Sequence, residues 1–147
     1  MRVAIVTPYY REPEEILERC HRSVLDQTYP CRHILVADGF PQKQVEGWSA
    51  DHLILPKPHG DNGNTPRGFG AISALNRSFD AFAFLDADNW IETDHIESMI
   101  RTWRATGAGL ICADRTIVLP DGEICPQEDE DLVSRQFADT SCMLITT

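Results

Sequence analysis

The chain has few basic residues. Lys and Arg number 13 against 23 Asp and Glu in 147 residues, so the formal net charge is -10. An acidic surface repels nucleic-acid phosphates unless basic side chains gather on one face. Lys57 and Arg67 are isolated in the sequence, and we therefore expect no nucleic-acid partner. An acidic protein that binds a phosphorylated ligand must offset the ligand's charge locally, by a metal, by backbone N–H groups or by one or two placed arginines.

Long apolar runs and paired cysteine motifs are also missing. The first apolar run ends at Thr7-Pro8 and is too short for a signal peptide or a membrane span. The five cysteines contain no Cys-x-x-Cys, so neither a disulfide framework nor a zinc ribbon is indicated. Cys20-His21 and Cys31-x-His33 leave a shared metal open, although buried thiols are the commoner state. These absences favour a reduced, cytoplasmic protein, and a peripheral position at a membrane stays open.

Hydrophobic residues make up 42% of the chain, enough for one core, so we expect a single domain over residues 1–147. Its first three elements alternate in type. Val3 to Val6 is predicted to be a strand buried on both faces, a helix begins at Pro13, and His33 to Ala37 is a second apolar strand. This order is a βαβ unit with parallel strands, and it predicts an α/β fold with a mostly parallel sheet.

The middle of the chain alternates in the same way. The segment Lys57 to Gly70 is rich in Gly, Asn and Pro, and is predicted to be a loop that is mobile without ligand. A helix over Arg67 to Ser78 is expected to turn Ile72, Leu75 and Phe79 inward. Further expectations are a strand from His52 to Leu55, a strand from Phe82 to Leu85, a helix capped by Thr93 that ends at Gly107, and a strand from Ala108 to Ala113.

Three features are expected near the end of the chain. Pro120-Asp121-Gly122 marks a hairpin-like turn, and Gln127 to Asp131 is an acidic surface loop. The strand from Cys142 to Thr146 is followed by no helix that could cover it. We expect this strand to expose an apolar face or an unpaired edge, which would favour a homo-oligomer.

Asp86 and Asp88 are the strongest candidates for chemistry. In parallel α/β sheets the ligand binds beyond the carboxyl ends of the strands, and this Asp-x-Asp directly follows an apolar strand. In extended backbone both carboxylates point to one side, and two hard oxygen ligands suit Mg²⁺ or Mn²⁺. The alternatives are an acidic capping turn and a haloacid dehalogenase-type phosphatase. In that phosphatase, however, the motif follows the first strand, whereas Asn89-Trp90 here follow a strand in the middle of the chain.

Five stretches taken together resemble the family 2 glycosyltransferases of the GT-A (Rossmann-like) fold. Each is weak or moderate alone, but they occur in order and at suitable spacing over the donor-binding half of such enzymes. They are Val3-Ala-Ile-Val-Thr-Pro-Tyr-Tyr-Arg-Glu12, Ser23-Val-Leu-Asp-Gln-Thr-Tyr-Pro30, Ile34-Leu-Val-Ala-Asp-Gly39, Ala74-Leu-Asn76 and Phe84-Leu-Asp-Ala-Asp-Asn89.

The resemblance implies a role for each matching residue. Thr7 and Tyr9 match positions whose backbone and aromatic ring hold the nucleotide base, and Asp38 matches the carboxylate that accepts a hydrogen bond from it. Asp86 matches the ribose-side aspartate and Asp88 the main ligand of Mn²⁺ or Mg²⁺. The donor set that this implies is completed by Pro8, Arg11, Arg67, Asn76 and Ala87, with Arg67 as the candidate for a diphosphate or sugar contact.

The implied activity is an inverting, metal-dependent transfer from a nucleotide-diphosphate sugar, with a UDP-sugar favoured, to a sugar, polysaccharide or lipid-linked acceptor. Two departures leave the base open: Ala37-Asp38 stands where two acids are common, and Leu75 replaces an Arg. The family's catalytic base follows a strand like Cys142 to Thr146, so we expect the acceptor part to lie beyond Thr147. Asp139 is the only weak candidate before that strand. The alternative function is a non-catalytic nucleotide-sugar-binding module or a fragment without a catalytic base.

Overall fold

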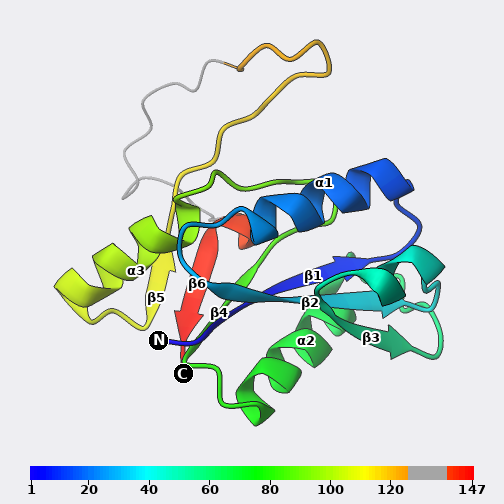
Figure 1. Ribbon diagram of the computed structural model, residues 1–147, viewed down its shortest axis with the longest axis horizontal. Coiled ribbons are helices and arrows are strands. Elements are labelled where there is room, and N and C mark those ends of the chain that lie inside the picture. Colours follow the sequence, from blue (N-terminus) through cyan, green and yellow to red (C-terminus); the bar gives the residue numbers. More distant parts are fainter. Residues whose placement is uncertain (126–138) are drawn as a thin grey trace.

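A computed structural model describes residues 1–125 and 139–147 as an α/β protein built around one six-stranded sheet (Figure 1). The strand order is β3-β2-β1-β4-β6-β5. The pairs β1–β2, β1–β4 and β2–β3 are parallel, whereas β6 runs antiparallel to β4 and β5. The strands are β1 (Val3–Tyr9), β2 (Cys31–Asp38), β3 (Asp51–Leu55), β4 (Ala81–Phe84), β5 (Leu110–Cys112) and β6 (Met143–Thr146). The predicted mostly parallel α/β sheet is thus confirmed.

Helices cover both faces of the sheet. In Figure 1, α1 (Glu14–Leu25) and α3 (His95–Thr106) lie on one face and α2 (Asn64–Asn76) on the other. Successive side chains of β1 point to opposite faces of the sheet. Val3 and Ile5 pack in the core under α1 and α3, while Ala4 and Val6 pack in the core under α2. A short 3-10 helix, η1 (Lys43–Gly47), connects β2 to β3.

β1 is longer than expected, because Thr7 and Pro8 continue it to Tyr9. Proline removes a ladder donor and is tolerated where a strand lacks a partner. β4 pairs with β1 only as far as Val6, so Pro8 lies beyond that ladder, where β2 is its remaining neighbour. The carboxyl end of β1 therefore projects past β4 at the edge where β2 also ends.

The prediction of an uncovered last strand is wrong. β6 lies between β4 and β5 and is hydrogen-bonded to both, and Leu144 is fully buried. The edge position falls to β5, whose Leu110 is exposed. The prediction assumed that only a following helix could cover this strand, whereas the strand inserts between β4 and β5. Since β6 runs antiparallel, its beginning lies at the carboxyl ends of β1, β2 and β4.

The segment predicted as a long loop contains the first turns of α2, which starts at Asn64 rather than Arg67. The inward face of this helix was also predicted wrongly, because Ile72 and Leu75 are exposed and only Phe79 is buried. The face on the sheet is made of small residues. A Cβ added to Gly70 would lie 2.2 Å from a methyl carbon of Val6, so glycine allows the helix to approach β1 closely.

The ends of α3 are partly as expected. Gly107 terminates the helix in the left-handed conformation (φ 65°), as predicted. The N-cap position belongs to Asp94 instead of Thr93, and its side chain makes no capping hydrogen bond. The turn at Asp121-Gly122 is confirmed by an antiparallel bridge between Val118 and Ile124. The predicted acidic loop from Gln127 to Asp131 lies outside the described residues.

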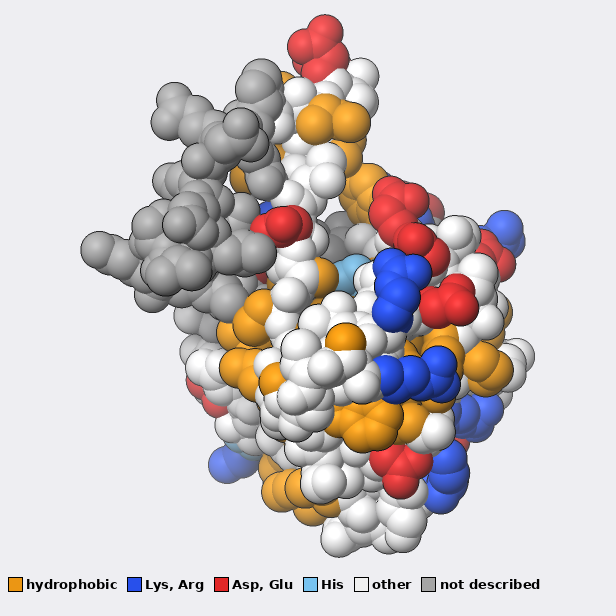
Figure 2. All heavy atoms as spheres, turned by 90° about the vertical axis from the view of Figure 1, so that its left-hand side faces the viewer, with side chains coloured by type: hydrophobic (Ala, Val, Ile, Leu, Met, Phe, Trp, Pro, Cys, Tyr) orange, Lys and Arg blue, Asp and Glu red, His pale blue; other side chains and the backbone are white. Residues whose placement is uncertain are grey.

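Charges are mixed on the surface that carries α3 and β5. Figure 2 shows acidic, basic and apolar side chains interspersed over the described part of this face. All five cysteines are free. Within residues 1–125 and 139–147, no helix is both long enough and apolar enough to cross a membrane.

Candidate functional site

A cavity of about 640 Å³ opens at the carboxyl ends of β1, β2 and β4, beside the N-terminus of α2. This volume is within the usual range for small-molecule sites. Polar and charged residues form much of the wall. The lining residues are Pro8, Tyr9, Tyr10, Glu12, Asp38, Pro58, His59, Gly60, Asp61, Asn62, Gly63, Pro66, Arg67, Asp86, Ala87 and Asp88.

Asp86 and Asp88 lie on a turn rather than on extended backbone. The N–H of Asn89 donates to the carbonyl oxygen of Asp86 over 3.0 Å, which closes the turn after β4. Asp86 is partly exposed and Asp88 is exposed, and both line the cavity. Arg19 of α1 donates to the carbonyl oxygen of Asp88 over 2.8 Å. The turn is thus anchored by its backbone, and both aspartates line the cavity.

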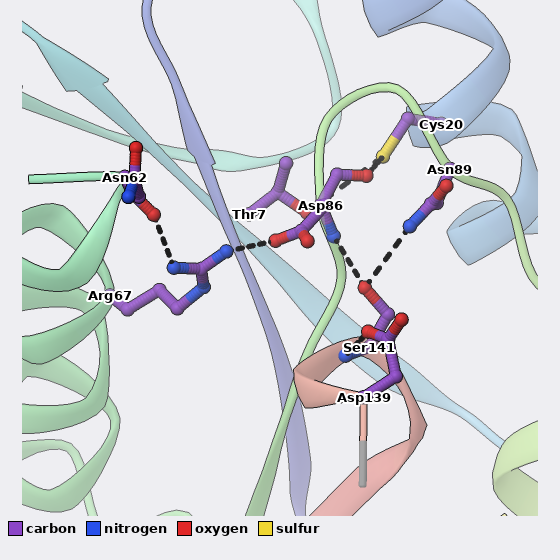
Figure 3. Close-up of polar contacts among 8 residues, drawn as sticks. All are labelled: Thr7, Cys20, Asn62, Arg67, Asp86, Asn89, Asp139 and Ser141. Carbon is purple, nitrogen blue, oxygen red and sulfur yellow. Dashed lines mark hydrogen bonds and ion pairs between the residues drawn. The ribbon is translucent and has the colours of Figure 1, made fainter. Parts of the chain in front are cut away.

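Arg67 projects from the first turns of α2 toward this turn (Figure 3). Its Nη2 forms an ion pair with Asp86 Oδ1, and its Nη1 donates to the carbonyl oxygen of Asn62 over 2.7 Å. The Nε of Arg67 is buried and has no hydrogen-bond partner among the described residues. The structure therefore places the predicted diphosphate contact directly against the predicted ribose-side aspartate.

A residue just before β6 forms hydrogen bonds to the same turn. Ser141 lies in the 3-10 helix η2 (Thr140–Cys142), and Figure 3 shows its hydroxyl between Asp86 and Asn89. Ser141 Oγ accepts hydrogen bonds from the Asp86 backbone N–H over 3.1 Å and from Asn89 Nδ2 over 3.3 Å. Ser141 is buried. No sequence pattern had marked this residue, because its partner is more than 50 positions away.

Asp139 caps η2 and has little freedom to act as a base. Its Oδ1 accepts from the Ser141 N–H over 3.0 Å and its Oδ2 accepts from Arg115 Nη1 over 2.7 Å. Burial raises the pKa of Asp139, but the Ser141 N–H and the positive charges of Arg115 and Arg67 outweigh it and leave the pKa below its usual value. A carboxylate with a lowered pKa is a weaker proton acceptor. This arrangement argues for a structural role.

Both carboxylate oxygens of Asp38 contact a neighbouring histidine. Asp38 Oδ2 accepts from the His59 backbone N–H over 3.0 Å, and Asp38 Oδ1 contacts His59 Nδ1 at 2.6 Å. The Asp38 side chain is 8% exposed. The aspartate that resembles the base-binding residue thus fastens the segment before α2 to the end of β2.

The ring of Tyr9 is not available for stacking on a base. Tyr9 is 2% exposed and packs in a core with Leu17 and Leu35. Its hydroxyl contacts His52 Nε2 at 2.7 Å and accepts from the Gln42 N–H, and burial raises the pKa of the phenol. The expected role of the Tyr9 ring is therefore corrected. Tyr10 also lines the cavity, and it is exposed.

The side chain of Thr7 turns into the core, away from the cavity. Its hydroxyl contacts His33 Nε2 at 2.9 Å, and His33 Nδ1 contacts His21 Nδ1 at 2.8 Å. Burial, followed by the charges of His21 and Arg32, lowers the pKa of His33 to about 3, so His33 is neutral at pH 7. His21 and His33 do meet, but no group of three or more His, Cys, Asp or Glu within the described residues could hold a metal. The pair is a buried hydrogen-bonding unit.

The sequence profile described as glycosyl transferase family 2 matches residues 4–138. The chain belongs to this family. A search of curated protein sequences found no match. Among solved structures, S. aureus TarS superimposes with a TM-score of 0.65 at 15% identity, covering 75% of this chain and 21% of that one. The structure confirms the GT-A-like sheet of the resemblance.

Two ligand complexes of TarS are also similar to this family 2 chain. TarS 1-349 in complex with UDP has a TM-score of 0.65 at 15% identity, and the complex with UDP-GlcNAc has a TM-score of 0.64 at 16% identity. Each match covers 75% of this chain, and 34% and 33% of the TarS chain respectively. The chain thus spans between a fifth and a third of the structures that it resembles.

Most of the residues that the family resemblance implies do line one cavity, and three do not. Pro8, Tyr9, Asp38, Arg67, Asp86, Ala87 and Asp88 line it, whereas Thr7, Arg11 and Asn76 do not. Arg11 lies over the ring of Phe40 at 3.9 Å. Asn76 is exposed at the C-terminal end of α2, twelve residues from the helix start at Asn64, and thus about 18 Å from the cavity end of the helix.

Asp86 and Asp88 fit the coordination chemistry of Mg²⁺ or Mn²⁺. Both are oxygen ligands, both line the cavity, and two carboxylates leave positions for water and phosphate oxygens. Among the described residues no third carboxylate, His or Cys joins them into a larger group. A cation here would thus depend on its ligand for further coordination. A second groove of about 400 Å³ between α1 and residues 90–93 contains none of the residues implied for the donor site.

Proposed function

We propose that this family 2 chain is the donor-binding domain of a glycosyltransferase, and that its cavity binds a nucleotide-diphosphate sugar, with a UDP-sugar favoured. The observation that carries the proposal is the convergence of Asp86, Asp88 and Arg67 on one cavity at the carboxyl ends of the parallel strands. The UDP and UDP-GlcNAc complexes of the structurally similar TarS support the choice of donor.

Within this proposal, Asp86 and Asp88 hold Mn²⁺ or Mg²⁺, and Arg67 contacts the diphosphate. The cation would supply Lewis-acid stabilisation of the charge that develops on the departing nucleoside diphosphate. Arg67 adds a planar guanidinium that can donate two parallel hydrogen bonds to phosphate oxygens. These two contributions offset the negative charge that an acidic protein could not otherwise accept.

The proposed reaction inverts the configuration at the anomeric carbon. An acceptor hydroxyl on a sugar, polysaccharide or lipid-linked acceptor attacks this carbon while its bond to the diphosphate breaks, and a base takes the hydroxyl proton. We do not assign this base to Asp139, because both of its carboxylate oxygens accept hydrogen bonds within the chain. A cytoplasmic location, peripheral to the membrane where the acceptor is lipid-linked, fits such a reaction.

Titration calorimetry with UDP in the presence of Mn²⁺ and then of EDTA tests the donor and metal assignments. We expect UDP to bind with Mn²⁺ and to lose most of its affinity when EDTA removes the cation, because Arg67 alone leaves the diphosphate charge incompletely offset. Equal affinity in both conditions would exclude the metal from donor binding. Failure of UDP to bind in either would reject the UDP-sugar assignment.

The competing function is a nucleotide-sugar-binding module without catalysis. It keeps the same cavity but transfers no sugar. Incubation with a UDP-sugar and Mn²⁺, followed by assays for free sugar and for glycosylated acceptor, separates the two functions. Binding without hydrolysis or transfer would favour the module.

A further inference from the structure

Arg67 stands against Asp86 inside the cavity, at the position where the proposed function requires a cation. Their side chains are only 14% and 30% exposed, so the ion pair is partly shielded from solvent. Figure 3 shows the guanidinium of Arg67 pointing from α2 directly at the carboxylate. In the ligand-free cavity, the charge of Asp86 is already neutralised by this chain's own arginine.

The backbone around Arg67 holds the guanidinium in this position. Gly63 is the N-cap residue of α2, with φ +80°, and its carbonyl oxygen accepts a hydrogen bond from the Arg67 N–H over 3.0 Å. A Cβ on Gly63 would lie 3.1 Å from Arg67 Nη1 and 3.2 Å from the ring of Pro8. With the Asn62 carbonyl oxygen accepting from Nη1, the guanidinium is enclosed on several sides. Its direction toward Asp86 is therefore built into the turn before α2.

The hydrogen bonds of Arg67 are nevertheless incomplete. Nη2 and Nη1 have acceptors, but the buried Nε has none among the described residues. A buried N–H without an acceptor is costly. Nε and Nη2 share the edge of the guanidinium that binds phosphate or carboxylate oxygens in pairs. A diphosphate could thus satisfy an N–H that Asp86 leaves unmatched.

These contacts have opposite consequences for a free metal ion and for a metal–diphosphate complex. A free cation near Asp86 meets the positive charge of Arg67 at close range, and it offers the guanidinium no alternative partner. A diphosphate brings acceptors for Arg67, which releases Asp86 for the cation. We propose that Arg67 is a specificity-determining residue that makes the cavity select a metal–diphosphate complex over a free divalent cation.

This inference rests on the proposed function, since it needs Asp86 to be a metal-side residue. It also implies that Mn²⁺ and UDP strengthen each other's binding, because each relieves an interaction that opposes the other. Coupling of this kind is reciprocal and commonly amounts to between about 5-fold and 150-fold in affinity. Without Arg67, the coupling should shrink because free Mn²⁺ no longer meets a competing cation.

The test measures Mn²⁺ affinity by electron paramagnetic resonance, with and without UDP, in the wild-type chain and in Arg67→Ala and Arg67→Met. The Met variant keeps the aliphatic stem, which guards against collapse of the cavity wall. Arg77→Ala is the matched control, because Arg77 follows the same helix and pairs with Asp51 away from the cavity. Circular dichroism verifies that each variant is folded.

Both Arg67 variants are expected to bind Mn²⁺ alone roughly tenfold more tightly than the wild type, and to show a smaller gain in Mn²⁺ affinity when UDP is added. Arg77→Ala should match the wild type. The inference is overturned when folded Arg67 variants bind free Mn²⁺ no more tightly than the wild type; the proposed function survives if wild-type chain still binds UDP with Mn²⁺. Failure of the wild type to bind UDP with Mn²⁺ overturns both.

Discussion

Asp38 and Asp86 occupy equivalent places at the ends of two parallel strands, but their surroundings differ. Asp38 is 8% exposed at its side chain, and both of its oxygens contact His59. The side chain of Asp86 is 30% exposed and contacts Arg67 through Oδ1, while the backbone N–H of Asp86 donates to Ser141 Oγ. The Asp38 carboxylate fastens one segment of the chain to another. The Asp86 carboxylate faces the guanidinium of Arg67 inside the cavity.

The comparison shows that two aspartates in equivalent positions can have different roles. Asp38 ends one apolar strand and Asp86 follows another, and the resemblance to family 2 implied a donor-binding role for both. At Asp38 the backbone N–H and the ring Nδ1 of His59 contact the two carboxylate oxygens, so the carboxylate has partners before any ligand arrives. At Asp86 the partner is an arginine that a phosphate could draw away. A strand-end carboxylate is thus better placed to bind a ligand when its internal partner can exchange.

The largest expected effect is on ligand binding at the Asp86 end. Asp88→Ala should weaken Mn²⁺-dependent UDP binding on the order of a hundredfold, because it removes one of the two proposed protein ligands of the cation. The free energy of unfolding should change by less than about 0.5 kcal/mol, since Asp88 is exposed on a turn. Calorimetry measures the first quantity and urea unfolding the second.

Asp94→Ala is the matched control for Asp88, because Asp94 is also exposed and its side chain caps no helix. It should leave UDP binding unchanged. If Asp88→Ala binds UDP with Mn²⁺ as tightly as the wild type, the cation is held elsewhere. If Asp88→Ala is unfolded by circular dichroism, its role is structural, and the contrast with Asp38 disappears.

At the Asp38 end, the effect should appear in stability. Asp38→Ala removes the acceptor of the His59 N–H and the partner of His59 Nδ1, so the free energy of unfolding should fall by roughly 1–3 kcal/mol. His59→Ala keeps the backbone N–H and should cost less. Urea unfolding of both variants measures the difference. A fully stable Asp38→Ala would mean that this carboxylate is free to serve the nucleotide base.

The sequence predicted the parallel sheet and the edge at which the cavity opens, because both depend on local patterns. Apolar runs marked the strands, and the residues after them, such as Asp38 and Asp86, were placed at one edge by topology alone. The helix face of α2 could not be predicted in this way. The close approach at Gly70 lets small residues face the sheet and leaves Ile72 in solvent, against the apolar periodicity.

The partners of the site residues were beyond the reach of sequence reasoning. His59 lies in a segment of turn residues and contacts Asp38 across 21 positions, and Ser141 contacts Asp86 across 55. Such pairs depend on where β6 inserts into the sheet and on how the segment before α2 folds back. The prediction for the Tyr9 ring was wrong for a related reason. Its place after a strand predicted exposure, but α1 and η1 bury the ring.

The smallest expected effect concerns Ser141, which would extend the comparison from the carboxylate of Asp86 to the turn that carries it. Ser141→Ala removes an acceptor for the Asp86 N–H and for Asn89 Nδ2, so the turn should hold its carboxylates less firmly. Loss of a residue that orients a metal ligand costs about 10-fold to 100-fold in affinity. We expect about tenfold weaker UDP binding with Mn²⁺ because Ser141 acts through the backbone.

Ser141→Thr, which keeps the hydroxyl, should restore most of the UDP affinity. Ser98→Ala, which removes a hydroxyl of α3 bonded to the His95 carbonyl oxygen, is the control for stability alone. Equal UDP affinity in Ser141→Ala and Ser98→Ala would limit Ser141 to a structural role and leave Arg67 as the main difference between the two ends of the cavity.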